Sequence, residues 1–269
     1  MLNLAKDVHK DYISTVNCKV STGKINKYIV IHYVGAEGDA KNNAIYFTKV
    51  HYDSKGKRIF SSAHYFVGFN GDIWQAVDDG NIAWHCGTAA NAYKHNICRN
   101  ENAIGIELCC RKNADNKTWR FEKATVNKAA KLTAMLLHQY DIPLKNVIRH
   151  YDVTGKVCPE PFVRDKKAWN DFLGLVKQEY KAVNGKYTVV NNCCVRNDNL
   201  QVIKHVNELP RYMQNISHDR VNGATVLKDT VVKIKTIKQD TSGNIWGVTP
   251  TGQYLPILYR GVAKMTKVS

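Results

Sequence analysis

The chain has 269 residues, of which 44% are hydrophobic and 23% are charged. This composition excludes wholesale disorder, a collagen-like repeat and a small disulfide-held scaffold. No apolar run approaches the roughly 18 residues of a membrane-spanning helix, so no membrane insertion is expected. Lys and Arg number 39 against 23 Asp and Glu, and the net charge of +16 favours anionic partners such as nucleic acid, acidic lipid or a cell wall that carries teichoic acids.

A first region, residues 1–181, alternates between strand and helix patterns. β-branched and aromatic runs predict strands at 28–34, 63–69, 73–77, 103–109 and 147–149. A short helix is expected at 42–50, apolar residues at helical spacing predict a helix at 124–140, and Asp165 is placed to cap a last helix. The turn Asn70-Gly71 between two apolar runs predicts a β-hairpin. The alternation indicates an α/β domain with one central sheet.

The remaining residues, 187–269, show a different pattern, which begins after a predicted linker at 182–186. Short strand patterns follow one another at 187–190, 201–206, 225–227, 231–237, 245–248 and 254–258. No helical period is visible, so a small all-β barrel is expected. Residues 186–269 hold 12 Lys or Arg against 5 Asp or Glu, which makes this part denser in positive charge than the first region.

Three residues of the first region could converge on one metal ion. His32 lies in the first strand pattern, His150 follows a short strand, and Cys158 comes eight residues later. Two imidazoles and a thiolate suit Zn²⁺, and three protein ligands leave a fourth position for a water molecule whose pKa the metal lowers toward about 7. An alternative stays open, because a histidine near a strand end is more often structural and a cysteine before proline is usually a buried small residue.

A hydrolase at such a metal also needs a proton carrier and a group that stabilises an oxyanion. Glu107 is the candidate for the first role, because a carboxylate inside an apolar strand is costly unless it is paired or functional. Lys156, two residues before Cys158, is the candidate for the second role. The alternatives are an edge strand on which Glu107 faces solvent and a plain solvated loop for Lys156.

At this point the sequence resembles a known family, through five segments that occur in order. The segments are Tyr28-Ile-Val-Ile-His32-Tyr, Ser62-Ala-His-Tyr-Phe-Val67, Ala83-Trp-His-Cys-Gly87, Ile104-Gly-Ile-Glu107-Leu and Arg149-His-Tyr-Asp-Val-Thr-Gly-Lys-Val-Cys-Pro159. Together they look like the zinc-dependent N-acetylmuramoyl-L-alanine amidases of the amidase type 2 family, and phage and prophage endolysins of Gram-positive hosts are the most similar in style. The resemblance covers about residues 20–180. It implies a mixed central sheet flanked by helices, the fold shared with peptidoglycan recognition proteins.

The resemblance also implies roles for individual residues. The family's zinc ligands fall on His32, His150 and Cys158, and its catalytic glutamate and lysine fall on Glu107 and Lys156. Segments that line the family's substrate groove contain His64, Trp84 and His85, and an ordinary packing role for His64 is equally open. Cys86 stands where the family more often has a small residue such as Ala, and we interpret it as a small apolar substitute.

The second region resembles a bacterial SH3-like cell-wall-binding domain, more weakly. The segment Cys194-Val-Arg-Asn197 and the stretches 224–237 and 244–247 carry this similarity. Tyr212, Trp246 and Tyr254 could stack on sugar or peptide, but Trp246 could equally fill the barrel core.

These inferences predict a two-domain zinc amidase that cleaves the amide between N-acetylmuramic acid and L-alanine of the peptidoglycan stem peptide. The expected partners are bacterial peptidoglycan and, through the C-terminal domain, anionic wall polymers. No specific nucleic-acid binding is expected, because no zinc-finger spacing, RNA-recognition signature or basic helix is present. The N-terminus shows no secretion signal, so synthesis in the cytoplasm and action on the wall after release are expected. The alternatives are a non-catalytic peptidoglycan-binding module and a zinc peptidase for another stem-peptide bond.

Overall fold

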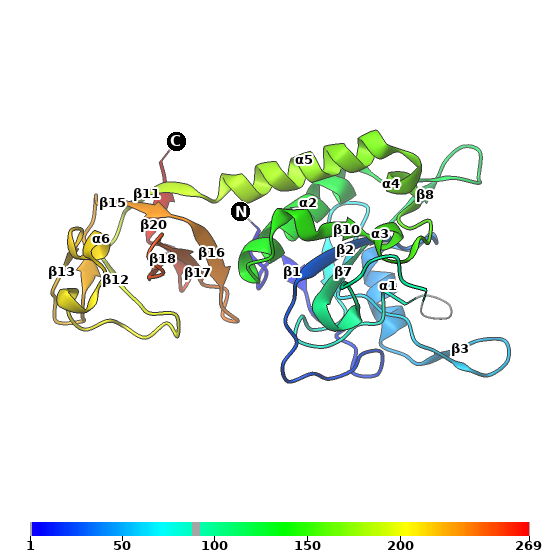
Figure 1. Cartoon of the computed structure of the whole chain (residues 1–269), viewed down its shortest axis with the longest axis horizontal. Coiled ribbons are helices and arrows are strands. Elements are labelled where there is room, and N and C mark those ends of the chain that lie inside the picture. The colour runs from blue at the N-terminus through cyan, green and yellow to red at the C-terminus, as the bar shows by residue number, and fades with distance from the viewer. Residues whose placement is uncertain (1, 88–91, 269) are drawn as a thin grey trace. The chain divides into compact units, whose positions relative to one another are not determined.

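The computed structural model describes residues 2–87 and 92–268. Contacts divide the chain into two compact units (Figure 1). The larger N-terminal unit contains Asp7–Glu179 together with Leu2, and the smaller C-terminal unit contains Asn3–Lys6 and Tyr180–Ser269. Helix α5 (Lys166–Ala182) and strand β11 (Gly185–Val189) occupy most of the residues assigned to a linker in the sequence.

The N-terminal unit is built on a six-stranded mixed sheet. Its neighbours are parallel except for β5 and β6, which form the antiparallel hairpin predicted around Asn70-Gly71. The order across the sheet is β1 (Val8–His9), β6 (Ile73–Gln75), β5 (Tyr65–Val67), β7 (Ala103–Leu108), β2 (Tyr28–Tyr33) and β10 (Val147–Arg149). The five predicted strands are therefore present, and the prediction of a mixed sheet flanked by helices is confirmed.

Helices α1 (Ala40–Phe47) and α2 (Lys123–Gln139) pack against opposite faces of this sheet. Phe66 of β5 shares a buried cluster with Ala44 of α1. The next side chain along β5, Tyr65, points to the other face because successive strand residues alternate. There the Tyr65 hydroxyl donates to Asp79, which also accepts from Tyr140 at the end of α2. The face that carries Phe66 also carries the candidate site.

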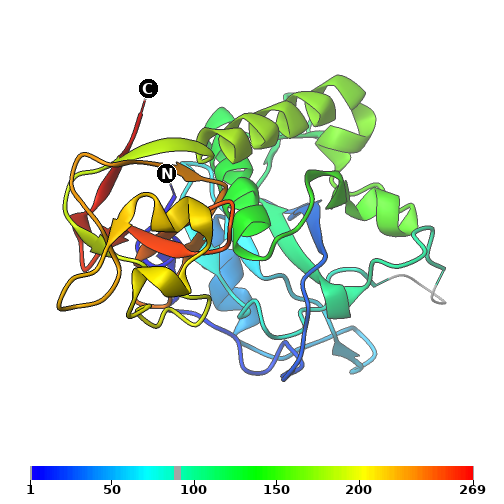
Figure 2. The ribbon, with the colours of Figure 1, turned by 60° about the vertical axis from the view of Figure 1, so that its left-hand side comes forward.

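The long helix α5 lies along α2 in both ribbon views (Figures 1 and 2), with Lys131 Nζ 4.0 Å from Glu179 Oε1. Asp165 caps its start as predicted, because the Asp165 Oδ1 atom accepts the backbone N–H groups of Lys167 and Ala168. Two helices that precede it, α3 (His150–Thr154) and α4 (Glu160–Arg164), were not predicted. Each has five residues, which is too short to display a helical period.

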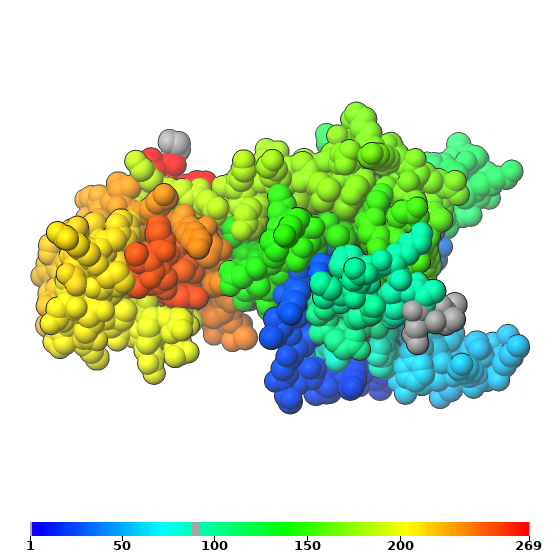
Figure 3. All heavy atoms as spheres, viewed as in Figure 1, coloured from blue at the N-terminus to red at the C-terminus, as the bar shows by residue number. Residues whose placement is uncertain are grey.

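Several short elements join the main ones in the N-terminal unit. The turns η2 (Asn100–Asn102) and η3 (Leu144–Asn146) lead into β7 and β10. Two small hairpins pair β3 (His51–Tyr52) with β4 (Arg58–Ile59) and β8 (Arg111–Lys112) with β9 (Trp119–Arg120). The light-blue β3–β4 hairpin projects from the surface of its unit (Figure 3). Its strands have two residues each, which is too short for an alternating pattern to be detected.

The C-terminal unit consists of three small antiparallel sheets and short helical turns. The first sheet has the order β15 (Val231–Ile234), β11 and β20 (Met265–Lys267), and the second has β12 (Cys193–Cys194), β14 (Thr225–Val226) and β13 (Ser217–His218). The third contains β16 (Thr236–Gln239), β17 (Ile245–Val248), β18 (Tyr254–Tyr259) and β19 (Val262–Ala263). The helical elements are η4 (Val206–Glu208) and α6 (Arg211–Gln214).

Three sequence predictions for this unit are wrong. The strand expected at 201–206 is reduced, among the described residues, to one isolated bridge between Val202 and Arg196. The strand expected at 231–237 breaks at Lys235, and its halves belong to different sheets. Helix α6 occurs where no helix was expected, because four residues after Pro210 show no period. Trp246 is buried, as the packing alternative required, and whether this unit is an SH3-like barrel stays a prediction.

Within the two described ranges, no helix combines the length and the hydropathy that crossing a membrane requires.

Candidate active site

The strand register places two predicted metal ligands side by side. β10 pairs in parallel with β2, and Arg149 lies opposite Ile31. The next residue along each segment is a histidine, His32 within β2 and His150 at the first position of α3. Both side chains are buried, and their ring centroids are 4.8 Å apart. Two segments far apart in the sequence thus supply neighbouring imidazoles.

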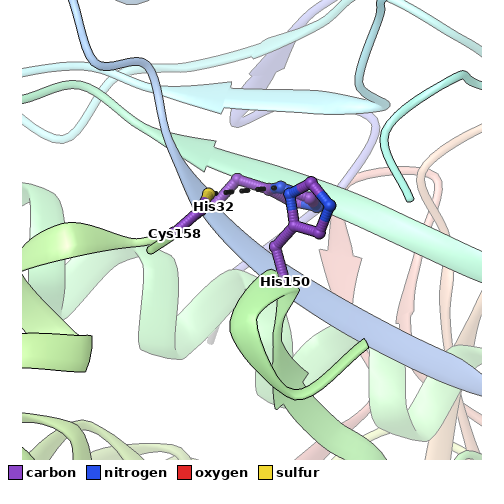
Figure 4. A group of neighbouring side chains, drawn as sticks. All are labelled: His32, His150 and Cys158. Carbon is purple, nitrogen blue, oxygen red and sulfur yellow. Dashed lines mark hydrogen bonds between the residues drawn. The ribbon is translucent and has the colours of Figure 1, made fainter. Parts of the chain in front are cut away.

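Cys158 reaches the same point because the chain turns back after α3. Gly155 ends α3 with a φ of 84°, in the left-handed region that glycine adopts readily, and the Tyr151 N–H donates to the Cys158 carbonyl at 2.8 Å. The Cys158 Sγ atom lies 3.7 Å from His32 Nδ1, and the three side chains point toward one another (Figure 4). Their ligand atoms all lie within 4.8 Å of one another, so this group, found among the described residues, could hold a metal ion.

The donor set and its spacing fit zinc. Two imidazoles and a thiolate are ligands that zinc prefers, and Zn–N and Zn–S distances of about 2.0 and 2.3 Å put tetrahedral N and S ligands roughly 3.6 Å apart. The separation between His32 Nδ1 and Cys158 Sγ is close to that value, at 3.7 Å. The Nε2 atom of His150 is buried and finds no hydrogen-bond partner in the described part of the chain, which leaves it available as a ligand.

Burial sets the protonation of these three side chains. It lowers the pKa of His150 to about 4 and the pKa of His32 well below the ordinary histidine value, and nearby cationic groups act in the same direction. Both imidazoles are therefore neutral at pH 7, which is the form that binds a metal ion. Burial raises the pKa of the Cys158 thiol to about 12, so a cation is needed to stabilise the thiolate there.

Glu107 lies in the same row of side chains as His32. β7 pairs with β2 on one side, where Glu107 is opposite His32, and with β5 on the other, where it is opposite Phe66. β7 is therefore an interior strand, and the edge-strand alternative for Glu107 is wrong. Its Oε2 atom is buried, with no hydrogen-bond partner among residues 2–87 and 92–268. Burial raises the pKa of this carboxyl to about 8, while the positive charge of Lys156 lowers it.

All of these groups open onto one cavity of about 590 Å³. Lys156 is exposed in its loop, yet it lines this cavity together with Glu107 and the three candidate ligands. Trp84 lines it too, as the resemblance implied. The arrangement combines a metal-binding group, a half-buried carboxylate and a cation around a space that a substrate could enter. Those are the three components that metal-assisted amide hydrolysis requires.

Some of the aromatic residues that line the cavity were not predicted from the sequence. Tyr46 and Phe60 line it, and the Phe60 ring meets the Trp84 ring edge-on with centroids 4.9 Å apart. The Arg58 guanidinium lies 4.9 Å from the Phe60 centroid and 5.9 Å from that of Trp84. No sequence motif indicated that these residues line the cavity. The nearest signal was the cluster of aromatic residues between the predicted strands at 28–34 and 63–69.

The side chains of His64 and His85 are more deeply buried than is expected of residues that line an open substrate groove. His64 is fully buried; its Nδ1 atom accepts the Gly105 N–H at 3.0 Å, and its Nε2 atom lies 2.8 Å from Lys24 Nζ. This favours the packing alternative and corrects the expected substrate contact of His64. His85 lines the cavity but is buried, and its Nδ1 atom lies 3.1 Å from Nε2 of His32.

Two known amidases are similar in sequence to this chain. CwlL of Bacillus licheniformis, an N-acetylmuramoyl-L-alanine amidase, is 33% identical over 149 residues, which cover 54% of this chain and 39% of the relative. CwlH of Bacillus subtilis (strain 168), of the same description, is 32% identical over 170 residues, covering 62% of this chain and 59% of the relative. The first of these matches thus spans about two fifths of the relative's length.

A solved structure supports the fold in the same way. The solution structure of the PlyG catalytic domain aligns with a TM-score of 0.50 and 22% identity, covering 64% of this chain and 94% of that domain. At this identity the likeness concerns the fold alone.

The family assignment rests on the sequence match along the N-terminal unit. The N-acetylmuramoyl-L-alanine amidase family of type 2 matches residues 22–161, which is 140 of the 269 residues and includes every candidate ligand, Glu107 and Lys156. The chain therefore belongs to the type 2 N-acetylmuramoyl-L-alanine amidase family.

Proposed function

We propose that the chain is a zinc-dependent peptidoglycan hydrolase that cleaves the amide between N-acetylmuramic acid and L-alanine of the stem peptide. The observation that carries this proposal is that His32, His150 and Cys158 converge at one cavity with Glu107. The Oε2 atom of Glu107 has no hydrogen-bond partner in the described part of the chain. Family membership supplies the class of substrate, and the donor set supplies the choice of zinc.

Two of the three ligands belong to regular elements, which favours a fixed geometry. His32 belongs to a strand with neighbours on both sides, and His150 starts a helix next to it. When bound there, zinc would act as a Lewis acid toward the scissile carbonyl and an attacking water. This chemistry needs one coordination position that no protein side chain occupies. A set of three protein ligands would leave such a position on a four-coordinate zinc.

Glu107 and Lys156 divide the remaining work between them. In its ionised form the Glu107 carboxylate takes a proton from the attacking water and later delivers it to the amine of L-alanine as that amine leaves. The half-buried Glu107 lines the cavity, and its Oε2 atom has no partner in the described ranges, which leaves it available to accept this proton. Lys156 supplies a positive charge at the same cavity, where it stabilises the negative charge that develops on the carbonyl oxygen.

The C-terminal unit would hold the enzyme on anionic wall polymers. Lys186 of β11 and Lys233 of β15 lie directly opposite each other in the sheet, and both are exposed. Like charges in that position destabilise a sheet, so a polyanion that bridges them would be favoured. The excess of positive charge in residues 186–269 supports the same proposal.

The test is an analysis of the chemical ends released from purified Gram-positive walls, with and without a chelator. We expect new alanine amino groups without new reducing sugar, lost on chelation and restored by Zn²⁺. New amino groups from another stem-peptide residue would contradict the bond assignment and favour a peptidase. Tight wall binding without new ends would contradict catalysis and favour a non-catalytic peptidoglycan-binding protein.

A further inference from the structure

The buried imidazole of His85 contacts the side of His32 that faces away from the other candidate ligands. His32 Nδ1 lies 3.7 Å from Cys158 Sγ, which is the ligand side of the ring. His32 Nε2, on the far side of the ring, lies 3.1 Å from His85 Nδ1. The two rings meet edge-on with centroids 5.1 Å apart, and both side chains are buried.

Counting protons fixes the direction of this hydrogen bond. A neutral imidazole carries one N–H and one acceptor nitrogen. If His32 uses Nδ1 to bind the metal, its Nε2 atom carries the proton and can only donate, so His85 Nδ1 has to accept. A histidine that binds a metal usually donates its second N–H to such a partner, which holds the ring in one tautomer and one orientation.

We propose that His85 is a positioning residue for His32, which it holds by accepting the N–H of His32 Nε2 so that Nδ1 faces the metal. This inference rests on the proposed function, because it requires a metal at the site. The sequence predicted that His85 contacts the substrate. In this proposal His85 acts instead through its hydrogen bond with the metal ligand His32.

The backbone around His85 fixes the accepting ring in turn. The side-chain oxygen of Asn100 accepts the backbone N–H groups of His85 and Cys86, at 3.0 and 2.7 Å. The ring itself packs on Gly105 of β7, where a Cβ atom would lie 2.7 Å from His85 Cγ and 2.8 Å from Nδ1. A glycine inside an apolar strand is thereby explained, because only a residue without a side chain leaves room for the imidazole.

One further group approaches the accepting atom. Cys86 Sγ lies 3.2 Å from His85 Nδ1. A thiol is a weak donor, so the N–H of His32 is the stronger partner for the single acceptor lone pair. A small apolar residue at position 86 would leave the bond between the two histidines in place.

The test compares two full-length variants, His85→Asn and His85→Leu. The amide oxygen of asparagine can occupy the place of Nδ1 and accept, whereas leucine fills similar space without an acceptor. The zinc dissociation constant is measured by competition with a chromophoric chelator, the absorption spectrum of the Co²⁺ form reports the ligand geometry, and circular dichroism checks folding. We expect His85→Leu to weaken zinc binding by about 10- to 100-fold and to alter the cobalt spectrum, and His85→Asn to recover most of both losses.

Four outcomes would overturn the inference or its basis. A folded His85→Leu variant that binds zinc as tightly as the wild type overturns it, as does a folded His85→Asn variant as weak as His85→Leu. If His85→Leu does not fold, ¹⁵N NMR of the zinc-loaded wild type decides, and we expect His32 protonated at Nε2; protonation at Nδ1 overturns the inference. A wild type that binds no zinc would remove the proposed function itself, a result distinguishable from an unaffected variant.

Discussion

Two buried cysteines, one in each unit, show what separates the candidate site from the rest of the molecule. Cys158 of the N-terminal unit is 3% exposed and Cys193 of the C-terminal unit is 4% exposed. Burial raises the pKa of both thiols to about 12. Of these two, Cys158 has an imidazole nitrogen nearby, His32 Nδ1 at 3.7 Å, whereas Cys193 lies in β12 opposite Val226.

The comparison teaches that burial alone does not make a site. Cys193 behaves as a small apolar residue whose thiol adds packing. Cys158 lies where strand register and a returning loop bring together polar groups that would be costly to bury without a function.

The largest effect is expected from removing each thiol in turn. Cys158→Ala should weaken zinc binding by more than about 100-fold, beyond the usual cost of losing a supporting residue, and should abolish wall hydrolysis. The matched control Cys193→Ala should keep full zinc content and activity while lowering the free energy of unfolding by about 1 kcal/mol, because it leaves a small cavity. Metal analysis, end-group release and chemical denaturation measure these effects. Equal loss of zinc from both variants would contradict the comparison.

The next effect concerns the carboxylate beside the ligands. Glu107→Gln preserves shape and removes the proton acceptor, so the rate of amide cleavage should fall by roughly 10²- to 10⁴-fold with zinc content unchanged. Glu101, an exposed residue of η2, provides the matched control Glu101→Gln, which should keep the wild-type rate. Near-normal cleavage by Glu107→Gln would remove Glu107 from the mechanism.

A smaller effect is expected from Lys24, a half-buried lysine whose Nζ atom lies 2.8 Å from His64 Nε2. Burial lowers the pKa of Lys24 from 10.5 to about 8, against opposing effects of nearby acidic groups. Between those values the unfolded chain holds a proton that the folded chain has released, so stability should rise with pH across this window and level off above it. Relative to Lys24→Met, the wild type should gain roughly 1 kcal/mol of unfolding free energy per pH unit there. Parallel pH curves for the two proteins would refute this account of Lys24.

The smallest effect is expected in the C-terminal unit. Trp246 is buried, and its Nε1–H donates to Asp240 at 3.0 Å. Trp246→Phe should cost about 1 kcal/mol for the lost hydrogen bond and leave zinc content and wall binding unchanged. Weaker wall binding at unchanged stability would instead make Trp246 a contact for sugar or peptide.

The same contrast explains how far the sequence could predict the structure. In the N-terminal unit, strands of apolar and β-branched residues were visible, and β2, β7 and β10 lie within a residue of their predicted bounds. His32, His150 and Cys158 could be picked out because few residue types bind zinc. Their convergence could not be derived from spacing alone, since it depends on the parallel register between β10 and β2.

Other features had no signal in the sequence. The roles of His64 and His85 depend on which ring nitrogen meets which neighbour, and identical residue types allow either a groove contact or a buried one. The cavity wall at Phe60 depends on a hairpin with two-residue strands. In the C-terminal unit, strands of two to six residues are shorter than the windows in which periodicity can be measured, so the break at Lys235 went undetected.

The most direct test of the central claim is a titration of metal-free protein with Zn²⁺ while amide cleavage in purified walls is followed. One metal ion held by His32, His150 and Cys158 predicts that the rate rises in proportion to added zinc and stops rising at one equivalent per chain. Full cleavage by the metal-free protein, or a rate that never responds to zinc, would contradict the account.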